Sequence, residues 1–464
     1  MDSIDSDNKN VSRREFLKRF GLSAASAMAM LTIGDLPLKA VQRPAPSAEG
    51  SPQDDANGMS YRVNNKTGDK VSLLGYGMMR LPNKNGQIDQ ELVNQEVDYA
   101  LAHGVNYFDT APMYGGGRSE TATGIALHRH PRKSYFIATK LSNQRGDQQT
   151  FEASKKIYEN SFKALQVDYI DYYLLHGVGG SGMEEFNRRF IDNGILDFLL
   201  KERKAGRIRN LGFSYHGNVE VFDWLVNNND KYQWDFCQIE CNYIDWRHAS
   251  LSKNGWKHDA DAEYLYNKCE KAHIQNVVME PLLGGRLARL PQQYGDQLKA
   301  IRPDDSAAAW AFRWVASKSN ILTTLSGMTQ MGVLEENVKT FSPLAALTPD
   351  EEALLEKVAD GMSGMPVVPC TGCHYCMPCP FGVDIPGNFA YYNEVINKGD
   401  MPSKSAADYK EKLKAFTKGY KKALDKKAWS TACRDCEACL PKCPQQIRIP
   451  NQLSRITELL NAEG

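Results

Sequence analysis

The sequence lacks any run of 18 or more apolar residues, so no segment is long enough to cross a bilayer as a stable helix. It also lacks a net charge, because 56 Lys and Arg residues balance 56 Asp and Glu residues. No global field is therefore available to attract nucleic acid or an anionic membrane. Hydrophobic residues make up 42% and charged residues 24% of the 464 residues, which excludes extensive disorder and collagen-like structure. We expect a folded protein of about two to four domains, with no nucleic-acid partner and no stable membrane span.

Cysteine is scarce before position 370 and dense after it. Of the 11 cysteines, Cys237, Cys241 and Cys269 are scattered through the larger part of the chain. The other eight lie in two short runs near the carboxyl terminus. We expect the three scattered cysteines to be buried core thiols, and the two runs to mark a separate small domain.

The amino terminus has a basic segment followed by a short apolar one. Residues 12–20 read SRREFLKRF, and the apolar stretch Leu22–Ile33 is rich in Ala and Ser. Paired arginines in this setting are typical of a twin-arginine export signal, and a basic cytoplasmic tail is the alternative. We predict a signal over residues 1–40 and a solvated linker over 41–60.

This signal has consequences for location and partners. The twin-arginine route carries proteins that are already folded, which suits a protein whose cofactor is inserted before export. The sequence therefore predicts a periplasmic protein that uses the twin-arginine translocase. If the signal stays attached, the protein is expected to be membrane-associated.

Eight strand-like runs alternate with helix-like runs between residues 61 and 345. The strand-like runs are LLGYGMM (73–79), VNYFDT (105–110), SYFIATK (134–140), DYIDYYLLH (168–176), RIRNLGFS (207–214), DFCQIE (235–240), IQNVVME (274–280) and ILTTLSG (321–327). Eight such units fit an α/β fold of the (β/α)₈ TIM-barrel type, whose usual size is about 250 residues. A doubly wound sheet is the alternative, but GYGMMRLP lacks the G-x-G-x-x-G turn that it would carry. We predict a barrel over 61–345 and a connecting helix or linker over 346–365.

Ionisable residues stand at the carboxyl ends of three consecutive predicted strands. Asp109 ends one strand with Tyr114 just beyond it, Lys140 ends the next, and His176 ends the third. In a (β/α)₈ barrel these ends meet at one mouth. A nearby ammonium lowers the pKa of a phenol, so we expect Tyr114 to act as the acid in carbonyl reduction, beside a Lys140–Asp109 pair and a neutral His176. A purely structural ion pair between Asp109 and Lys140 is the alternative.

These segments resemble the signatures of the aldo/keto reductase family. DTAPMY, FIATK and YYLLH match its active-site segments, and GFS, QIE, EPLLGG and GMTQMGVLEEN follow in the family's order, over about residues 60–345. The resemblance implies a (β/α)₈ barrel with a catalytic tetrad of Asp109, Tyr114, Lys140 and His176, acting on a small carbonyl or alcohol.

The same resemblance implies a nicotinamide cofactor, NAD(P)(H), across the barrel mouth. Its carboxamide would contact Ser214 and Gln238. The other implied contacts are Leu283, Gly284, Gly285 and Arg286 near the pyrophosphate, Glu336 and Asn337 near the adenine, and Gly327.

Three positions depart from the family's pattern. Tyr215 replaces the asparagine that usually follows the serine, and Met279 stands where an aromatic ring usually stacks on the nicotinamide. No Lys or Arg lies between Gly327 and Asn337 to bind a 2′-phosphate. A preference for the phosphorylated cofactor is therefore not expected, and its form is left open.

The two cysteine runs read CTGCHYCMPCP and CRDCEACLPKCP. The second matches the bacterial ferredoxin motif, and the first is one residue shorter in its last gap. The motif predicts two 4Fe–4S clusters, with the fourth cysteine of each run reaching the other cluster. The predicted ligand sets are Cys370, Cys373, Cys376 and Cys443 for one cluster, and Cys433, Cys436, Cys439 and Cys379 for the other.

The short gap before Cys379 leaves this exchange of fourth ligands open. Disulfide bonds and zinc sites are the alternatives to the clusters. GVDIP and IRIP follow the two runs, which favours a duplicated, ferredoxin-like α+β domain over residues 366–464. Between the runs, residues 398–427 hold ten lysines against four acidic residues, which fits either a solvated helix or a docking face for an acidic redox partner.

Together these features predict an exported iron–sulfur oxidoreductase. It would interconvert a carbonyl and an alcohol, with Tyr114 as general acid and base and with hydride from a nicotinamide cofactor. One alternative is a barrel that uses a different electron carrier. Another is an electron-transfer or binding protein without carbonyl reductase activity.

Overall fold

The computed structural model describes residues 53–54, 58–252, 260–443, 445 and 447–462. The predicted export signal and most of the predicted linker lie outside these residues. Within the described ranges, no helix is long and apolar enough to cross a membrane.

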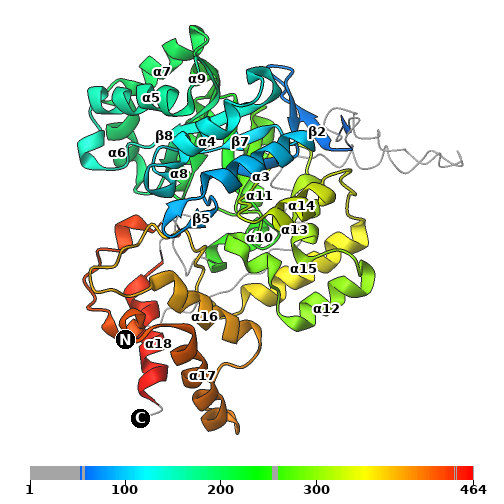
Figure 1. Cartoon of the computed structure of the whole chain (residues 1–464), viewed down its shortest axis with the longest axis vertical. Helices are drawn as coiled ribbons and strands as arrows, with labels where there is room; N and C mark the ends of the chain where they lie inside the picture. The colour runs from blue at the N-terminus through cyan, green and yellow to red at the C-terminus, as the bar shows by residue number, and fades with distance from the viewer. Residues whose placement is uncertain (1–52, 55–57, 253–259, 444, 446, 463–464) are drawn as a thin grey trace, which may run out of the picture. The chain divides into compact units, whose positions relative to one another are not determined.

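Eight parallel strands close into a barrel (Figure 1). In chain order they are β4 (Leu74–Gly77), β7 (Tyr107–Asp109), β8 (Phe136–Leu141), β9 (Ile170–Val178), β10 (Ile208–Tyr215), β11 (Phe236–Glu240), β12 (Gln275–Met279) and β13 (Ile321–Ser326). Each strand pairs with the next, and β13 pairs with β4, where Thr324 lies opposite Leu74. Each predicted strand overlaps one of these eight, and β8, β9 and β10 extend one or two residues past the predicted ends, so the (β/α)₈ prediction is confirmed.

The barrel interior is filled by aromatic and branched side chains. The rings of Tyr107 and Tyr172 lie 4.9 Å apart between centroids, and those of Tyr172 and Phe236 lie 5.2 Å apart. Val277 and Leu322 are completely buried in the same cluster. Alternating strand residues point inward and pack into layers, so the barrel is a solid core and any site must lie at an end.

Helices surround the strands (Figure 1). They are α3 (Gln90–Ala102), α4 (Ser119–Leu127), α5 (Phe151–Leu165), α6 (Gly182–Phe186), α7 (Ile195–Lys204), α8 (Val219–Asn227), α9 (Asn229–Tyr232), α10 (Asp245–Ser252), α11 (Ala262–Lys271), α12 (Gln292–Ile301), α13 (Ala307–Ala316) and α14 (Met331–Thr340). The sequence-predicted connection contains α15 (Pro349–Ser363), which starts with a capping box between Thr348 and Glu351. Leu355 and Val358 of α15 are buried in the barrel's hydrophobic core.

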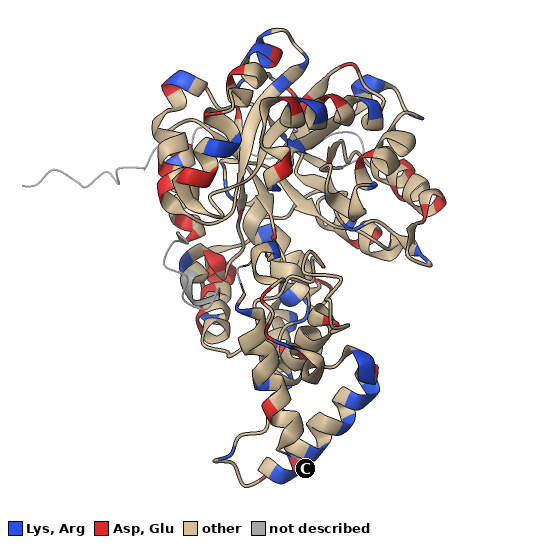
Figure 2. Cartoon of the chain, turned by 90° about the vertical axis from the view of Figure 1, so that its left-hand side faces the viewer, with Lys and Arg blue, Asp and Glu red and all other residues tan. Residues whose placement is uncertain are grey.

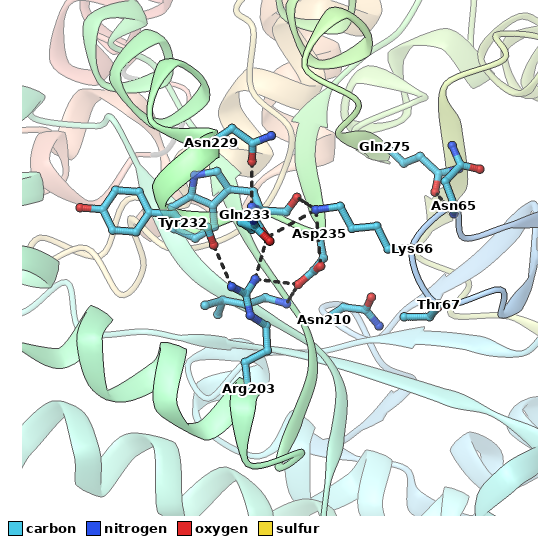
Figure 3. Close-up of polar contacts among 12 residues, drawn as sticks. Asn65, Lys66, Thr67, Arg203, Asn210, Asn229, Tyr232, Gln233, Asp235 and Gln275 are labelled. Atoms are coloured by element: carbon cyan, nitrogen blue, oxygen red, sulfur yellow. Dashed lines mark hydrogen bonds and ion pairs between the residues drawn. The ribbon is translucent and has the colours of Figure 1, made fainter.

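A hairpin of β2 (Ser60–Val63) and β3 (Lys70–Ser72) covers the amino ends of the barrel strands. In its loop, Lys66 Nζ lies 3.6 Å from Asp235 Oδ1, just before β11 (Figure 3). The Asn65 N–H donates to Gln275 Oε1 at 2.8 Å, at the start of β12 (Figure 3). These contacts close the amino end of the barrel, so the carboxyl ends of the strands form the open mouth.

The residues after α15 form helices and cysteine-containing loops. The helices are α16 (Ile385–Asn397), α17 (Tyr409–Ala423) and α18 (Ile449–Asn461). The Ile-Pro pairs of the two sequence repeats start α16 and α18, where proline fits because an N–H in the first turn has no helical partner. The buried side chains of α16 and α18 share one hydrophobic cluster.

The predicted α+β architecture of this domain differs from the structure. Across the described residues between 366 and 462, no β-strand is found. Prolines such as Pro378 and Pro380 interrupt the cysteine segments and have no N–H for a sheet ladder. The cysteines therefore lie on irregular loops between helices.

Candidate active site

Three consecutive strands bring the predicted catalytic residues to the barrel mouth. Asp109 ends β7, Lys140 lies in β8 and His176 lies in β9. Tyr114 follows β7 in a short 3₁₀ turn, Tyr114–Gly116. All four side chains are buried, Tyr114 with 8% of its surface exposed. The structure thus gathers the four residues that the sequence predicted at one site.

Glycines allow Tyr114 to turn back toward the strands. Gly115, Gly116 and Gly117 have φ angles of 57°, 67° and 86°. This left-handed region strains residues with a Cβ atom but not glycine. Three such glycines in succession let the chain reverse direction directly after Tyr114.

A buried ion pair lies at the centre of the site. Lys140 Nζ is 2.5 Å from Asp109 Oδ1 and also donates to the Thr110 carbonyl at 2.8 Å. The Gln238 side-chain amide donates to Asp109 Oδ2 at 3.3 Å. Burial lowers the pKa of Lys140 and raises that of Asp109, while the attraction between them opposes both shifts. Removing either partner would leave a buried charge uncompensated.

Tyr114 and His176 complete the constellation. Lys140 Nζ lies 4.9 Å from the Tyr114 ring centroid. The Tyr114 and His176 rings meet edge to face, with centroids 5.7 Å apart. His176 Nδ1 is 2.6 Å from the Ser142 hydroxyl, which fixes the orientation of the imidazole. A phenol, an ammonium and an imidazole therefore surround one small region.

The electrostatics of Tyr114 differ from the sequence-based expectation. We expected Lys140 to lower the pKa of Tyr114, but burial instead raises that pKa well above its usual value. The expectation is wrong because desolvation of the phenolate dominates and the Lys140 ammonium is directed at Asp109 and Thr110. Burial also lowers the pKa of His176 well below its usual value, aided by Lys140. At neutral pH the site therefore holds a protonated phenol and a neutral imidazole.

The residues implied for the nicotinamide carboxamide lie beside the tetrad. Ser214 is at the carboxyl end of β10, and its hydroxyl accepts a hydrogen bond from the Gly177 N–H at 2.9 Å. Gln238, in β11, points at Asp109. Both side chains are buried at the mouth, but both already have partners within the protein.

The loop implied for the pyrophosphate is occupied by protein groups. The Gly284 N–H donates to Glu280 Oε2 at 2.6 Å, so a carboxylate accepts the hydrogen bond that a phosphate would need. A Cβ atom on Gly284 would lie 2.3 Å from the Cα of Thr371, so the first cysteine segment packs directly on this glycine. Gly285 and Arg286 belong to the same 3₁₀ segment, Leu283–Ala288, and burial lowers the pKa of Arg286.

The residues implied for the adenine side follow β13. Asn337 is buried in α14, and its amide donates to the Ser326 hydroxyl at 3.1 Å. Glu336 is exposed on the same helix, and Gly327 is exposed just after β13. These positions do not fit a bound dinucleotide. The Gly284 N–H is bonded to a carboxylate, and the segment of Thr371 packs on the same glycine. The Asn337 amide is bonded within the protein.

The eight clustered cysteines line two cavities in the carboxyl-terminal domain. The inner cavity is lined by Cys370, Cys373, Cys376 and Cys443. The outer cavity is lined by Cys379, Cys433, Cys436 and Cys439, with Cys376 at the shared wall. This is the grouping that exchange of the fourth cysteines requires, and each cavity offers four thiols to an iron–sulfur cluster.

In the described ranges, the cysteines from Cys370 to Cys439 form no disulfide bond. The same ranges contain no group of three or more His, Cys, Asp or Glu side chains arranged to hold a single metal ion.

Three side chains at the barrel mouth were not predicted from the sequence. Arg80 follows β4, and its guanidinium donates to the Thr371 carbonyl at 2.5 Å. Glu280 follows β12, and Tyr375 lies between two cysteines of the first run. The position of Arg80 and Glu280 just after barrel strands could have identified them, but no sequence signal connects Tyr375 to the barrel.

Comparison with known proteins matches the two parts of the chain separately. The model of the aldo/keto reductase family matches residues 73–360, and that of the 4Fe-4S dicluster domain matches residues 369–447. L-galactose dehydrogenase from Arabidopsis thaliana is 24% identical over 64% of this chain and 93% of its own length. NADH-specific methylglyoxal reductase from Escherichia coli (strain K12) is 23% identical over 63% of this chain and 96% of its own.

Among solved structures, an aldo/keto reductase from Klebsiella pneumoniae in complex with NADP and acetate aligns with a TM-score of 0.51. It is 22% identical, and the alignment covers 64% of this chain and 94% of that one, which shows the shared barrel fold. The family match covers most of the chain, from the first barrel strand to α15. The chain thus belongs to the aldo/keto reductase family, and its barrel is followed by a 4Fe-4S dicluster domain.

Proposed function

We propose that the protein is an iron–sulfur oxidoreductase that interconverts a small carbonyl compound and its alcohol. The observation that carries this proposal is the buried constellation of Asp109, Tyr114, Lys140 and His176 at one mouth. Reduction of a carbonyl to an alcohol takes two electrons and two protons. Tyr114 donates the proton that reaches the carbonyl oxygen, since its phenol is protonated and packs edge to face against the neutral His176.

The other tetrad residues position the Tyr114 phenol and the substrate oxygen. The Lys140 ammonium, paired with Asp109, lies 4.9 Å from the centre of the Tyr114 ring, and this cation–π contact helps to hold the ring in place. The neutral imidazole of His176, oriented by Ser142, is a hydrogen-bond partner for the substrate oxygen. These roles do not depend on which group supplies the electrons.

Two electron sources are candidates. A nicotinamide cofactor is the source predicted from the sequence, and the names of two relatives favour it: one is an NADH-specific reductase, and one was solved with NADP. The contacts of Gly284 with Glu280 and Thr371 favour the second candidate, in which the clusters deliver two electrons, one from each. In that case an external one-electron donor protein reduces the clusters, and both protons come from the site and solvent.

Substitution of Glu280 separates these two sources. Burial raises the pKa of Glu280 to about 7, so the carboxylate is ionised at pH 8 and opposes a pyrophosphate at Gly284. We expect Glu280→Gln to tighten NADH and NADPH binding at pH 8 by about 10-fold, measured by calorimetry on the holoenzyme. Glu458→Gln, which removes an exposed carboxylate from α18, is the matched control. Submicromolar dinucleotide binding by the unaltered protein would make nicotinamide the source.

The pH dependence of turnover tests the proposed acid. Anaerobically prepared holoenzyme is assayed with methylglyoxal and with L-galactose, using NADH, NADPH or reduced methyl viologen for reduction and the oxidised carriers for oxidation. Because the pKa of Tyr114 is raised and that of His176 is lowered, we expect kcat for reduction, measured at saturating electron carrier, to be constant from about pH 6.5 to 9. Oxidation needs the deprotonated phenol, so its kcat should rise with pH over the same range. A kcat for reduction that falls through neutral pH with reduced methyl viologen, whose use does not depend on Glu280, would contradict the assignment of Tyr114.

The carboxyl-terminal domain is proposed to hold two 4Fe–4S clusters that exchange electrons with an acidic redox protein. Cys436 is exposed, and Arg434 and Lys442 line the outer cavity beside it. Lysines are also spaced along α17 from one end to the other (Figure 2). We further propose, from the twin-arginine motif, that the folded protein is exported to the periplasm by the twin-arginine translocase.

A further inference from the structure

The segment from Cys370 to Cys376 lies against the barrel mouth. Its Thr371 carbonyl accepts the hydrogen bond from Arg80, and its backbone packs on Gly284. Near the second cysteine run, Gln445 donates to Glu240 Oε1 at 3.0 Å, at the end of β11. These three contacts hold the lining of the inner cavity against the barrel mouth.

Tyr375 is the side chain of this segment that reaches the barrel mouth. Its hydroxyl lies 3.9 Å from Sδ of Met79, which follows β4 at the carboxyl ends of the barrel strands. Tyr375 is also one of the groups that raise the pKa of Tyr114. Tyr375 is partly exposed, whereas Tyr114 is buried, so solvent reaches the Tyr375 side chain more readily.

The hydroxyl of Tyr375 has a weak partner. It donates to Met79 Sδ at 3.9 Å, and within the described part of the chain no other hydrogen bond of this hydroxyl is found. A thioether sulfur is a poor acceptor compared with a carbonyl or hydroxyl oxygen. An oxygen-bearing ligand that enters the mouth would therefore gain a donor at little cost to the protein.

The main chain of Tyr375 is connected to the inner cavity. Its N–H donates to the sulfur of Cys373, and the Gly372 N–H donates to Cys370 Sγ at 3.4 Å. Hydrogen bonds to ligand sulfurs are among the factors that set cluster potentials. A bound substrate that moves Tyr375 would therefore change the hydrogen bond to the sulfur of Cys373, which we propose to be a ligand of the inner cluster.

We propose that Tyr375 is a substrate-positioning residue of the barrel site, contributed by the iron–sulfur domain. Its hydroxyl leaves Met79 and donates to an oxygen of the substrate, opposite Tyr114. This rests on the proposed carbonyl–alcohol function and adds a residue that lies outside the barrel, in the carboxyl-terminal domain. The substrate class is a carbonyl with a second oxygen function within reach, such as a dicarbonyl or hydroxycarbonyl compound.

The test compares Tyr375→Phe with the unaltered holoenzyme. The change removes one hydroxyl and keeps the ring, so iron content and the visible spectrum should match. With methylglyoxal, which carries two carbonyl oxygens, we expect KM to rise about 5- to 10-fold while kcat changes less than about 2-fold, as for one lost hydrogen bond. Tyr391→Phe is the matched control, because the Tyr391 hydroxyl bonds to the Phe416 carbonyl within the carboxyl-terminal domain.

Two further measurements do not depend on turnover. In a Tyr114→Phe background, calorimetry should show methylglyoxal binding weakened about 5- to 10-fold when Tyr375→Phe is added. In the same background, methylglyoxal should shift the midpoint of the inner cluster in a redox titration followed by electron paramagnetic resonance. Tyr375→Phe should remove most of that shift.

The outcomes separate this proposal from the function on which it rests. Unchanged KM, binding and midpoint shift in Tyr375→Phe, together with turnover that requires Tyr114, would overturn the role of Tyr375 and leave the carbonyl function intact. No turnover of any carbonyl by the unaltered holoenzyme would overturn both. A loss confined to KM and binding, absent from Tyr391→Phe, establishes Tyr375 as part of the site.

Discussion

Tyr114→Phe is expected to reduce carbonyl turnover by about 10²- to 10⁴-fold, the usual contribution of a positioned acid. The change deletes only the hydroxyl, so the ring keeps its edge-to-face contact with His176 and its place near Lys140. The loss should fall on kcat, because the proton is needed in the transition state and not for binding. Stopped-flow assays on anaerobic holoenzyme measure it directly.

The control for this prediction is Tyr243→Phe, which removes another buried hydroxyl from the barrel. It should retain most of the activity, and both variants should keep the iron content and visible spectrum of the unaltered protein. If Tyr114→Phe turned over carbonyls at the normal rate, the tetrad would be a structural ion pair with a capping tyrosine. The reaction would then need a different acid.

Loss of single cysteines should divide the eight thiols into two sets. Because Cys443 lines the inner cavity with Cys373, Cys443→Ser and Cys373→Ser should lose the same cluster signal in electron paramagnetic resonance. Cys379→Ser and Cys436→Ser should lose the other signal. Each variant should keep about half of the iron of the unaltered protein, since one four-iron cluster remains.

Cys269→Ser is the control, because this buried thiol belongs to the barrel core and should affect neither signal. The opposite pairing, in which Cys443 shares its signal with Cys436, would mean that each run holds its own cluster. Full iron content in all four variants would leave no cluster ligand among them. Either result would replace the ligand sets given by the two cavities.

The local sequence pattern was sufficient to predict the barrel and the positions of its acidic and basic residues. Strand ends are marked by short branched and aromatic runs, and a barrel forces the ends of adjacent strands together. The sequence pattern alone therefore predicts Asp109, Lys140 and His176 at one mouth. Ser142, which orients His176, was not found, because a lone serine after a strand has no distinguishing pattern.

The features that could not be predicted from the sequence depend on contacts between segments that are distant in the chain. The raised pKa of Tyr114 follows from burial, and part of its surroundings is Tyr375, more than 250 residues later. The contact of Thr371 with Gly284 likewise joins two segments with no shared periodicity. The α+β expectation for the last domain failed because the cysteine spacing specifies ligands and not backbone hydrogen bonding.

The hairpin of β2 and β3 also bears on how the two parts of the chain are used. Within the described residues, its contacts close the amino end of the barrel, whereas Thr371 and Tyr375 lie against the carboxyl end. The iron–sulfur domain therefore borders the same end of the barrel as Tyr114, and a change in that domain is positioned to affect the chemistry at the tetrad.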